Sequence, residues 1–165
     1  MDRGTTDSLN MSLKLKQLEH AAKHTFWDFI GCELVEHKGD QVVVAFDILP
    51  HHLNLIGIVH GGMHASAIDS AMGILVMLAR PEANVVTVNL NMNYVASTGE
   101  GRVIVTAEMI HSSRKLITAQ AYARKENGDL LAFGTGTFRV LEKHAPEAQT
   151  GNNGRGMIDE RGTRT

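Results

Sequence analysis

The run from residue 61 to residue 80 constrains the fold most, because it is the most apolar segment and yet carries one carboxylate, Asp69. From Met63 to Ala79 apolar residues fall on every side of a helix drawn through the run, with no clean polar stripe. Such a pattern is typical of a helix surrounded by protein. About seventeen helical residues span ~25 Å, which is enough to cross a small domain. We therefore expect a central helix with the rest of the domain wrapped around it.

Asp69 needs an explanation, because a charged carboxylate in apolar surroundings is unfavourable unless it is paired or hydrogen-bonded. Two interpretations are open. In the first, the helix begins later and Asp69 is its N-cap, accepting a hydrogen bond from a backbone N–H. In the second, the helix begins at Gly61 or Gly62, whose free N–H groups suit an oxygen that carries negative charge. Asp69 then lies about two turns into the helix as a carboxylate able to activate water.

Strand-like runs flank the central helix, two before it and four after it. Alternating apolar residues between 42 and 48 indicate a strand with one buried face. Two strands, one helix and four consecutive strands predict an α+β domain with a mainly antiparallel sheet. The predicted strands cover residues 31–37, 41–49, 84–94, 101–111, 116–125 and 130–141.

The length of 165 residues fits one domain. We expect a disordered N-terminus at 1–7, a single domain at 8–144 and a flexible tail at 145–165, where hydrophobic periodicity is lost. Within the domain, an amphipathic helix is predicted over 9–24. An apolar cluster follows it and is expected to cover one end of the core: Phe26, Trp27, Phe29 and Ile30.

Composition excludes several classes of protein. A net charge of -2 without a Lys/Arg run argues against binding to nucleic acid or a membrane surface. The single cysteine, Cys32, leaves no internal disulfide, and the polar N-terminus resembles no targeting signal, so a cytoplasmic location is expected. The chain has no P-loop, no dinucleotide glycine fingerprint and no Gly-x-Ser-x-Gly elbow, which disfavours nucleotide hydrolysis, a Rossmann dehydrogenase and a serine esterase.

A short motif opens the central helix. His60, Gly61 and Gly62 form a His-Gly-Gly tripeptide, with Asn54 six residues before it and Asp69 seven residues after its second glycine. This arrangement resembles the active-site segment of the hotdog-fold acyl-CoA thioesterases, and within them the PaaI-like, phenylacetyl-CoA thioesterase group. The resemblance implies a hotdog fold, an antiparallel sheet of five to six strands wrapped around a central helix at about 61–80, with an N-terminal helix.

The resemblance also implies a reaction, the hydrolysis of an acyl- or aryl-CoA thioester to free acid and CoA. Asp69 matches the general base or nucleophile, and these two routes stay open. The Gly61 N–H matches the oxyanion donor, and His60 fixes the turn by hydrogen bonding. Asn54 and Thr87 match positions that orient the water or the carbonyl in relatives. In those enzymes the carboxylate faces the glycine of a partner chain, which implies a homodimer or a dimer of dimers with active sites at the subunit interface.

Further candidates concern the substrate. Arg114 and Lys115 match the place where relatives hold the phosphates of coenzyme A. The remaining substrate-binding candidates lie in the loop before the helix and in the helix itself: Leu53, Ile56, Gly62, Met63 and Met72.

Four histidines, His51, His52, His60 and His64, invite a metal interpretation, but no carboxylate or third histidine completes a motif. We therefore expect no metal and no cofactor.

Two alternative functions remain on the same fold. One is a non-catalytic acyl-CoA sensor, against which the intact Asn54, Gly61 and Asp69 argue. The other is a hotdog enoyl-CoA hydratase, in which His60 and Asp69 would together move a substrate proton.

Overall fold

The structure of this chain is a computed structural model, and it describes residue 18 and residues 20–142. The predicted disordered N-terminus, the predicted tail at 145–165 and most of the predicted helix at 9–24 lie outside the described residues. Residues 18 and 20–22 are helical. A short helix, α2 (Phe26–Phe29), precedes the first strand.

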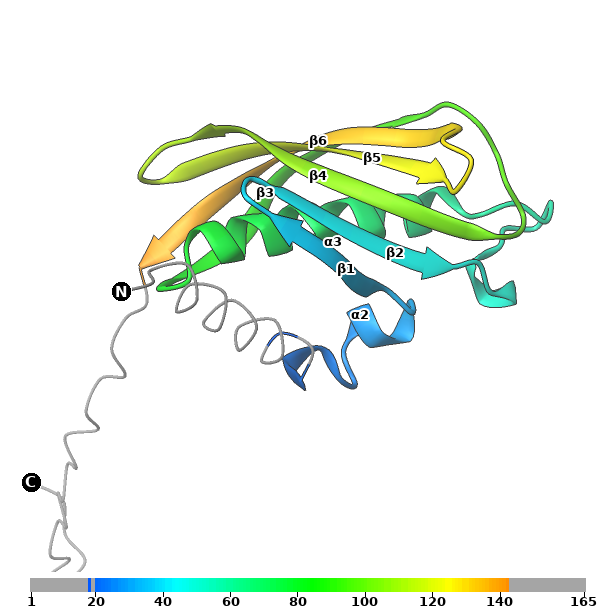
Figure 1. The fold of residues 1–165 in the computed structure, drawn as a ribbon, viewed down its shortest axis with the longest axis horizontal. Coiled ribbons are helices and arrows are strands. Elements are labelled where there is room, and N and C mark those ends of the chain that lie inside the picture. Colours follow the sequence, from blue (N-terminus) through cyan, green and yellow to red (C-terminus); the bar gives the residue numbers. More distant parts are fainter. Residues whose placement is uncertain (1–17, 19, 143–165) are drawn as a thin grey trace, which may run out of the picture.

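One six-stranded antiparallel sheet packs on one long helix (Figure 1). Its strands follow the spatial order β1-β2-β4-β5-β6-β3. The long helix, α3 (Gly61–Ala79), packs against the five strands from β2 to β6. The predicted α+β architecture around a central helix is therefore confirmed. The strand bounds are β1 (Glu33–Lys38), β2 (Gln41–Asp47), β3 (Ala83–Tyr94), β4 (Arg102–Ser112), β5 (Leu116–Lys125) and β6 (Leu130–Glu142).

Small side chains let α3 approach the sheet closely. Ala67 and Ala71 of the helix are fully buried, as are Ala119 and Ala121 of β5. A Cβ added to Gly136 of β6 would lie 2.8 Å from the Cε of Met72 on the helix, so any larger residue there would require the Met72 side chain to move. The helix also has the length and hydropathy of a membrane span, but here it packs against the sheet as a core helix.

Part of the predicted apolar cluster near the N-terminus is wrong. Ile30 is buried in the core and Trp27 packs against it, as expected. Phe26 and Phe29, however, are 60% and 68% exposed. The helix α2 has a single turn, so it presents only one side to the core and leaves these two rings on the other.

In the described part of the chain, the strand β3 forms one edge of the sheet and pairs only with β6. It is 12 residues long, and Val86 and Val88 on it are exposed. A long edge strand with exposed apolar residues is a ready surface for pairing with another chain.

Candidate functional site

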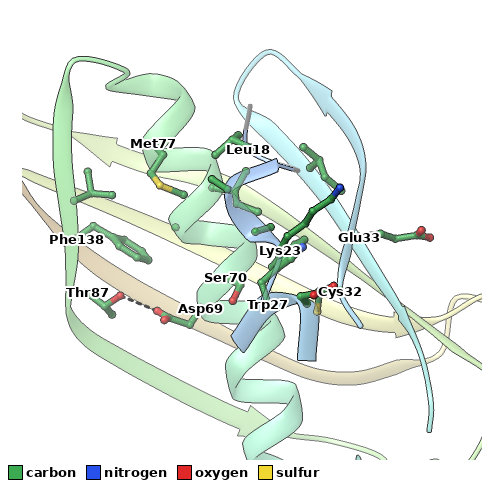
Figure 2. Close-up of a pocket in the computed structure, with 17 residues that line it drawn as sticks. Leu18, Lys23, Trp27, Cys32, Glu33, Asp69, Ser70, Met77, Thr87 and Phe138 are labelled. Atoms are coloured by element: carbon green, nitrogen blue, oxygen red, sulfur yellow. Dashed lines mark hydrogen bonds between the residues drawn. The ribbon is translucent and has the colours of Figure 1, made fainter. Parts of the chain in front are cut away.

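Asp69 lies in the interior of α3, nine residues along a helix that begins at Gly61. The N-cap of this helix is His60, so the interpretation of Asp69 as an N-cap is wrong. The hydroxyl of Thr87 on β3 donates a hydrogen bond of 3.0 Å to Oδ1 of Asp69 (Figure 2). The structure thus brings together two of the residues that the sequence singled out.

Two opposing effects set the proton affinity of Asp69. Partial burial raises the pKa of its carboxyl above the ordinary value, because a charged group is poorly solvated there. The hydrogen bond from Thr87 acts the other way, since it stabilises the charged form. A carboxylate with a raised pKa is a better proton acceptor at neutral pH than an ordinary one.

A β-bulge explains how Thr87 comes to face the helix. The register between β3 and β6 shifts between Thr87 and Asn89, which leaves Val88 as the extra residue. Before the bulge Val85 and Thr87 face α3, and after it Leu90 and Met92 pack against the core. The alternation of side chains therefore changes from odd to even positions at this point. No sequence pattern predicted this shift.

Asp69 opens onto a cavity of about 680 Å³ between α3, β3 and the segment that leads into β1. Its walls are mainly apolar and include Trp27, Ile74, Met77 and Phe138 (Figure 2). Cys32 also lines it, and burial raises the pKa of this thiol to about 12, so it stays protonated. Cys32 is therefore a buried core residue rather than a nucleophile.

The start of α3 holds the second half of the predicted site. Nδ1 of His60 accepts a hydrogen bond of 2.8 Å from the Gly62 N–H, so this histidine caps the helix as expected. Within the described part of the chain, no group accepts a hydrogen bond from the Gly61 N–H. This donor is therefore available, and it lies at the positive end of a helix of 19 residues.

Tyr94, which sequence reasoning missed, contacts this helix start from the end of β3. Its hydroxyl donates to the carbonyl oxygen of Gly61 at 3.2 Å. A Cβ added to Gly61 would lie 3.3 Å from the tyrosine ring, so glycine allows this close approach. Tyr94 is far from the His-Gly-Gly motif in sequence, and no spacing rule links the two.

Asn54 organises its own loop. Its Oδ1 accepts hydrogen bonds from the N–H groups of Ile56 and Ile58, at 3.0 and 3.3 Å. Its carbonyl oxygen accepts another from the Gly57 N–H at 3.0 Å. The side-chain oxygen of Asn54 is therefore already engaged within the loop, an arrangement typical of an Asx turn.

The apolar residues predicted to line the acyl pocket are scattered. Met72 is fully buried under the sheet and lines neither the large cavity nor a smaller hollow beside the start of α3. Ile56 is largely exposed on its loop. Leu53 is half-buried and pairs with Val59 in an isolated bridge. Met63 and Gly62 line a smaller hollow of about 200 Å³ beside the start of α3.

The predicted basic pair lies in the turn between β4 and β5, where Arg114 and Lys115 are exposed. The guanidinium of Arg80, at the end of α3, donates to the Ser112 hydroxyl at 2.7 Å. This contact places the turn beside the C-terminal end of α3. The basic pair therefore lies near the C-terminal end of α3. Asp69 lies earlier along the same helix.

The histidines form no cluster of metal ligands in the described residues. His60 precedes the helix, so it does not form an i, i+4 pair on one helix face with His64. His52 and His64 are buried, and burial lowers the pKa of both side chains, which favours their neutral forms.

Gly61 and Asp69 are eight residues apart on one straight helix, so they are separated by about 12 Å along its axis. During hydrolysis the oxyanion donor and the base act on the same thioester group. Both must therefore lie within a few ångströms of it. One chain therefore does not bring its own Gly61 and Asp69 onto a single carbonyl.

Comparison with known proteins agrees with this architecture. Residues 56–132 match the thioesterase superfamily. The TT0310 protein from Thermus thermophilus is 30% identical in sequence, and its structure aligns with a TM-score of 0.65 over 70% of this chain and 97% of that one. A variant of the phenylacetic acid degradation protein PaaI from the same organism is 29% identical, with a TM-score of 0.65 over 70% of this chain and 98% of that one.

A mammalian relative matches as well. The acyl-coenzyme A thioesterase 13 of Mus musculus is 26% identical over 106 residues, which are 63% of this chain and 76% of that protein. Family match, fold and relatives agree with the family that the His-Gly-Gly motif indicated. The chain therefore belongs to the thioesterase superfamily, as a hotdog-fold thioester hydrolase of the PaaI-like group.

Proposed function

We propose that this protein hydrolyses acyl-CoA thioesters and that Asp69 is its catalytic carboxylate. The observation that carries the proposal is a half-buried carboxylate, held by Thr87, at the wall of a large apolar cavity. Water attacks the thioester carbonyl while Asp69 takes the proton of the water, and the carbonyl oxygen becomes an oxyanion. Collapse of this intermediate breaks the C–S bond, and the proton passes to the CoA thiolate.

The oxyanion is held by the Gly61 N–H of a second copy of the chain. The separation along α3 supports this, because the donor and the base on one chain are too far apart for one carbonyl. The free edge of β3 supplies a surface on which two copies can pair, with Thr87 and Tyr94 on the same strand. A backbone donor aimed at the forming oxyanion contributes roughly 3 kcal/mol to the transition state.

His60 and Tyr94 act as positioning residues for this donor. They hold the peptide unit that follows the donor, since Tyr94 donates to the Gly61 carbonyl and His60 accepts from the Gly62 N–H, and this fixes the Cα of Gly61, next to the donor N–H. A peptide held at both ends is fixed before substrate binds, and preorganised donors need no rearrangement during the reaction. Asn54 contributes by holding the shape of the preceding loop.

Arg114 and Lys115 are proposed to bind the phosphates of coenzyme A. Both are exposed in the turn between β4 and β5, outside the apolar cavity, so a charged group of the substrate can reach them without entering that cavity. Direct attack of Asp69 on the thioester, through a mixed anhydride, gives the same products. A single turnover in heavy-oxygen water separates the two routes, because label in Asp69 itself requires the anhydride.

The experiment that tests the proposal measures free thiol released from a panel of acyl-CoAs with short, medium, long, phenylacetyl and hydroxybenzoyl groups. Thiol release from at least one of them is expected. A protein that binds acyl-CoA tightly and releases no thiol from any would instead be a sensor. Loss of the double bond of an enoyl-CoA without thiol release would indicate a hydratase.

The Thr87→Val substitution is expected to shift the pH dependence of kcat/KM. The Thr87 hydroxyl stabilises the charged carboxylate, so its removal raises the pKa of Asp69 further. Since the base must be deprotonated, the acid limb of the profile moves to higher pH. Thr87→Ser keeps the hydroxyl and is the matched control, expected to leave the limb in place. An unmoved limb in the valine variant would contradict the proposed contact between the two side chains during catalysis.

A further inference from the structure

Gly73 lies in the interior of α3, one turn after Asp69, and lines the large cavity. Glycine is unfavourable in the middle of a helix relative to alanine, because its backbone loses more conformational freedom on folding. A glycine there therefore calls for a reason, and close packing is the usual one.

Close packing does not explain Gly73. Among the described residues, a Cβ added to it would meet only one atom within 4 Å, Cε1 of Phe138 at 3.8 Å, which is ordinary van der Waals contact. At Gly136 the corresponding distance to the Cε of Met72 is 2.8 Å, so a side chain at that position would displace Met72 within the core. The missing side chain of Gly73 instead leaves space in the cavity beside the carboxylate.

Gly73 is the middle member of a row of three α3 residues that line the cavity. We call the strip of cavity along this row the lane. Asp69, Gly73 and Met77 follow one another at intervals of one helical turn and all line the cavity. Asp69 and Met77 are therefore about 12 Å apart along the helix. An extended chain advances about 1.2 Å per bond, as the backbone does, so this lane matches an acyl chain of about ten carbons.

The chemistry of the lining agrees with an apolar occupant. Ile74, Val85 and Phe138 contribute hydrocarbon or aromatic surface along the lane. Apart from Asp69, the charged residues of the lining are Lys23, Asp28 and Glu33, all exposed and all from the segment on the opposite side. An apolar chain bound here keeps its thioester at Asp69 and its end near Met77.

We propose that Gly73 is a specificity-determining residue, which admits a medium-length apolar acyl chain into the cavity beside Asp69. The inference rests on the proposed function, since the thioester must lie at Asp69. It assigns the acyl site to the face of α3 that carries Gly73 and Met77, not to the loop at 53–56.

Two variants test the inference, with kcat/KM measured by thiol release across straight-chain acyl-CoAs from butyryl to palmitoyl. Gly73→Leu fills the lane and is expected to lower kcat/KM for decanoyl-CoA at least tenfold, while butyryl-CoA changes less than about threefold, in line with the usual effect of pocket volume. Gly73→Ala is expected to raise the melting temperature and to shift the preferred chain length downwards. Ala79→Leu adds a similar side chain to α3 away from the cavity and serves as the control.

The outcomes separate the inference from the function on which it rests. A chain-length profile that is the same in wild type and both Gly73 variants would overturn the role of Gly73 and leave thioester hydrolysis intact. If Gly73→Leu does not fold, the alanine variant alone decides, because its added methyl group has room in the structure. No thiol release by the wild type would overturn the proposed function together with the inference.

Discussion

Replacement of Asp69 by asparagine is expected to lower kcat/KM for the best acyl-CoA by at least ~100-fold, the usual contribution of a positioned acid or base. Asparagine keeps the shape of the side chain, and its carbonyl oxygen can still accept the hydrogen bond from Thr87. It cannot take a proton from water. The measurement is the rate of thiol release at saturating and at limiting concentrations of the acyl-CoA.

Stability and binding are the controls for this variant. Burial disfavours the charged form of Asp69, so the neutral amide is expected to leave the melting temperature unchanged or raise it. Binding of acyl-CoA, measured by calorimetry, is expected to persist. Unchanged turnover in a folded Asp69→Asn protein would remove Asp69 from the mechanism, whereas lost turnover with lost binding would indicate a role in substrate binding.

Mixed dimers are expected to regain activity that neither parent variant has. Gly61→Pro removes the N–H of the first helical residue, a position where proline fits helix geometry and where His60 already has an extended backbone. In a heterodimer of Gly61→Pro and Asp69→Asn chains, one site combines the intact glycine of one chain with the intact aspartate of the other. With two-fold symmetry, purified heterodimers are expected to show about half the wild-type activity.

The comparison depends on purifying the heterodimer through two different affinity tags. Gly61→Ala is the matched control for the proline variant, because it keeps the N–H and adds only a Cβ, 3.3 Å from the Tyr94 ring. Heterodimers as inactive as their parents would place both groups in the same chain. A protein that is monomeric and fully active would overturn the shared site altogether.

Local periodicity in the sequence was enough to predict the main elements. The predicted strand at 116–125 coincides with β5, and the other predicted strands match the structure to within two residues at every end. The central helix begins at Gly61, one of the two starting points that the sequence allowed, and His60 caps it as expected. These features depend on neighbours within a few residues, which is why a single sequence reveals them.

Other features depend on residues far apart in the chain. The bulge at Val88 turns Thr87 toward Asp69, and Tyr94 reaches Gly61 across 33 positions. Met72 was expected in the acyl pocket, but a helix that is apolar on all sides gives no sign of which face meets the sheet and which faces a cavity. The space beside Gly73 exists only because side chains from α3, β3, β6 and the N-terminal segment leave it unfilled. The sequence thus determined the elements and the candidates for the reactive residues, because these follow from local spacing. Only the tertiary structure decided which faces meet and where a substrate has room, because packed volume is a property of several elements at once.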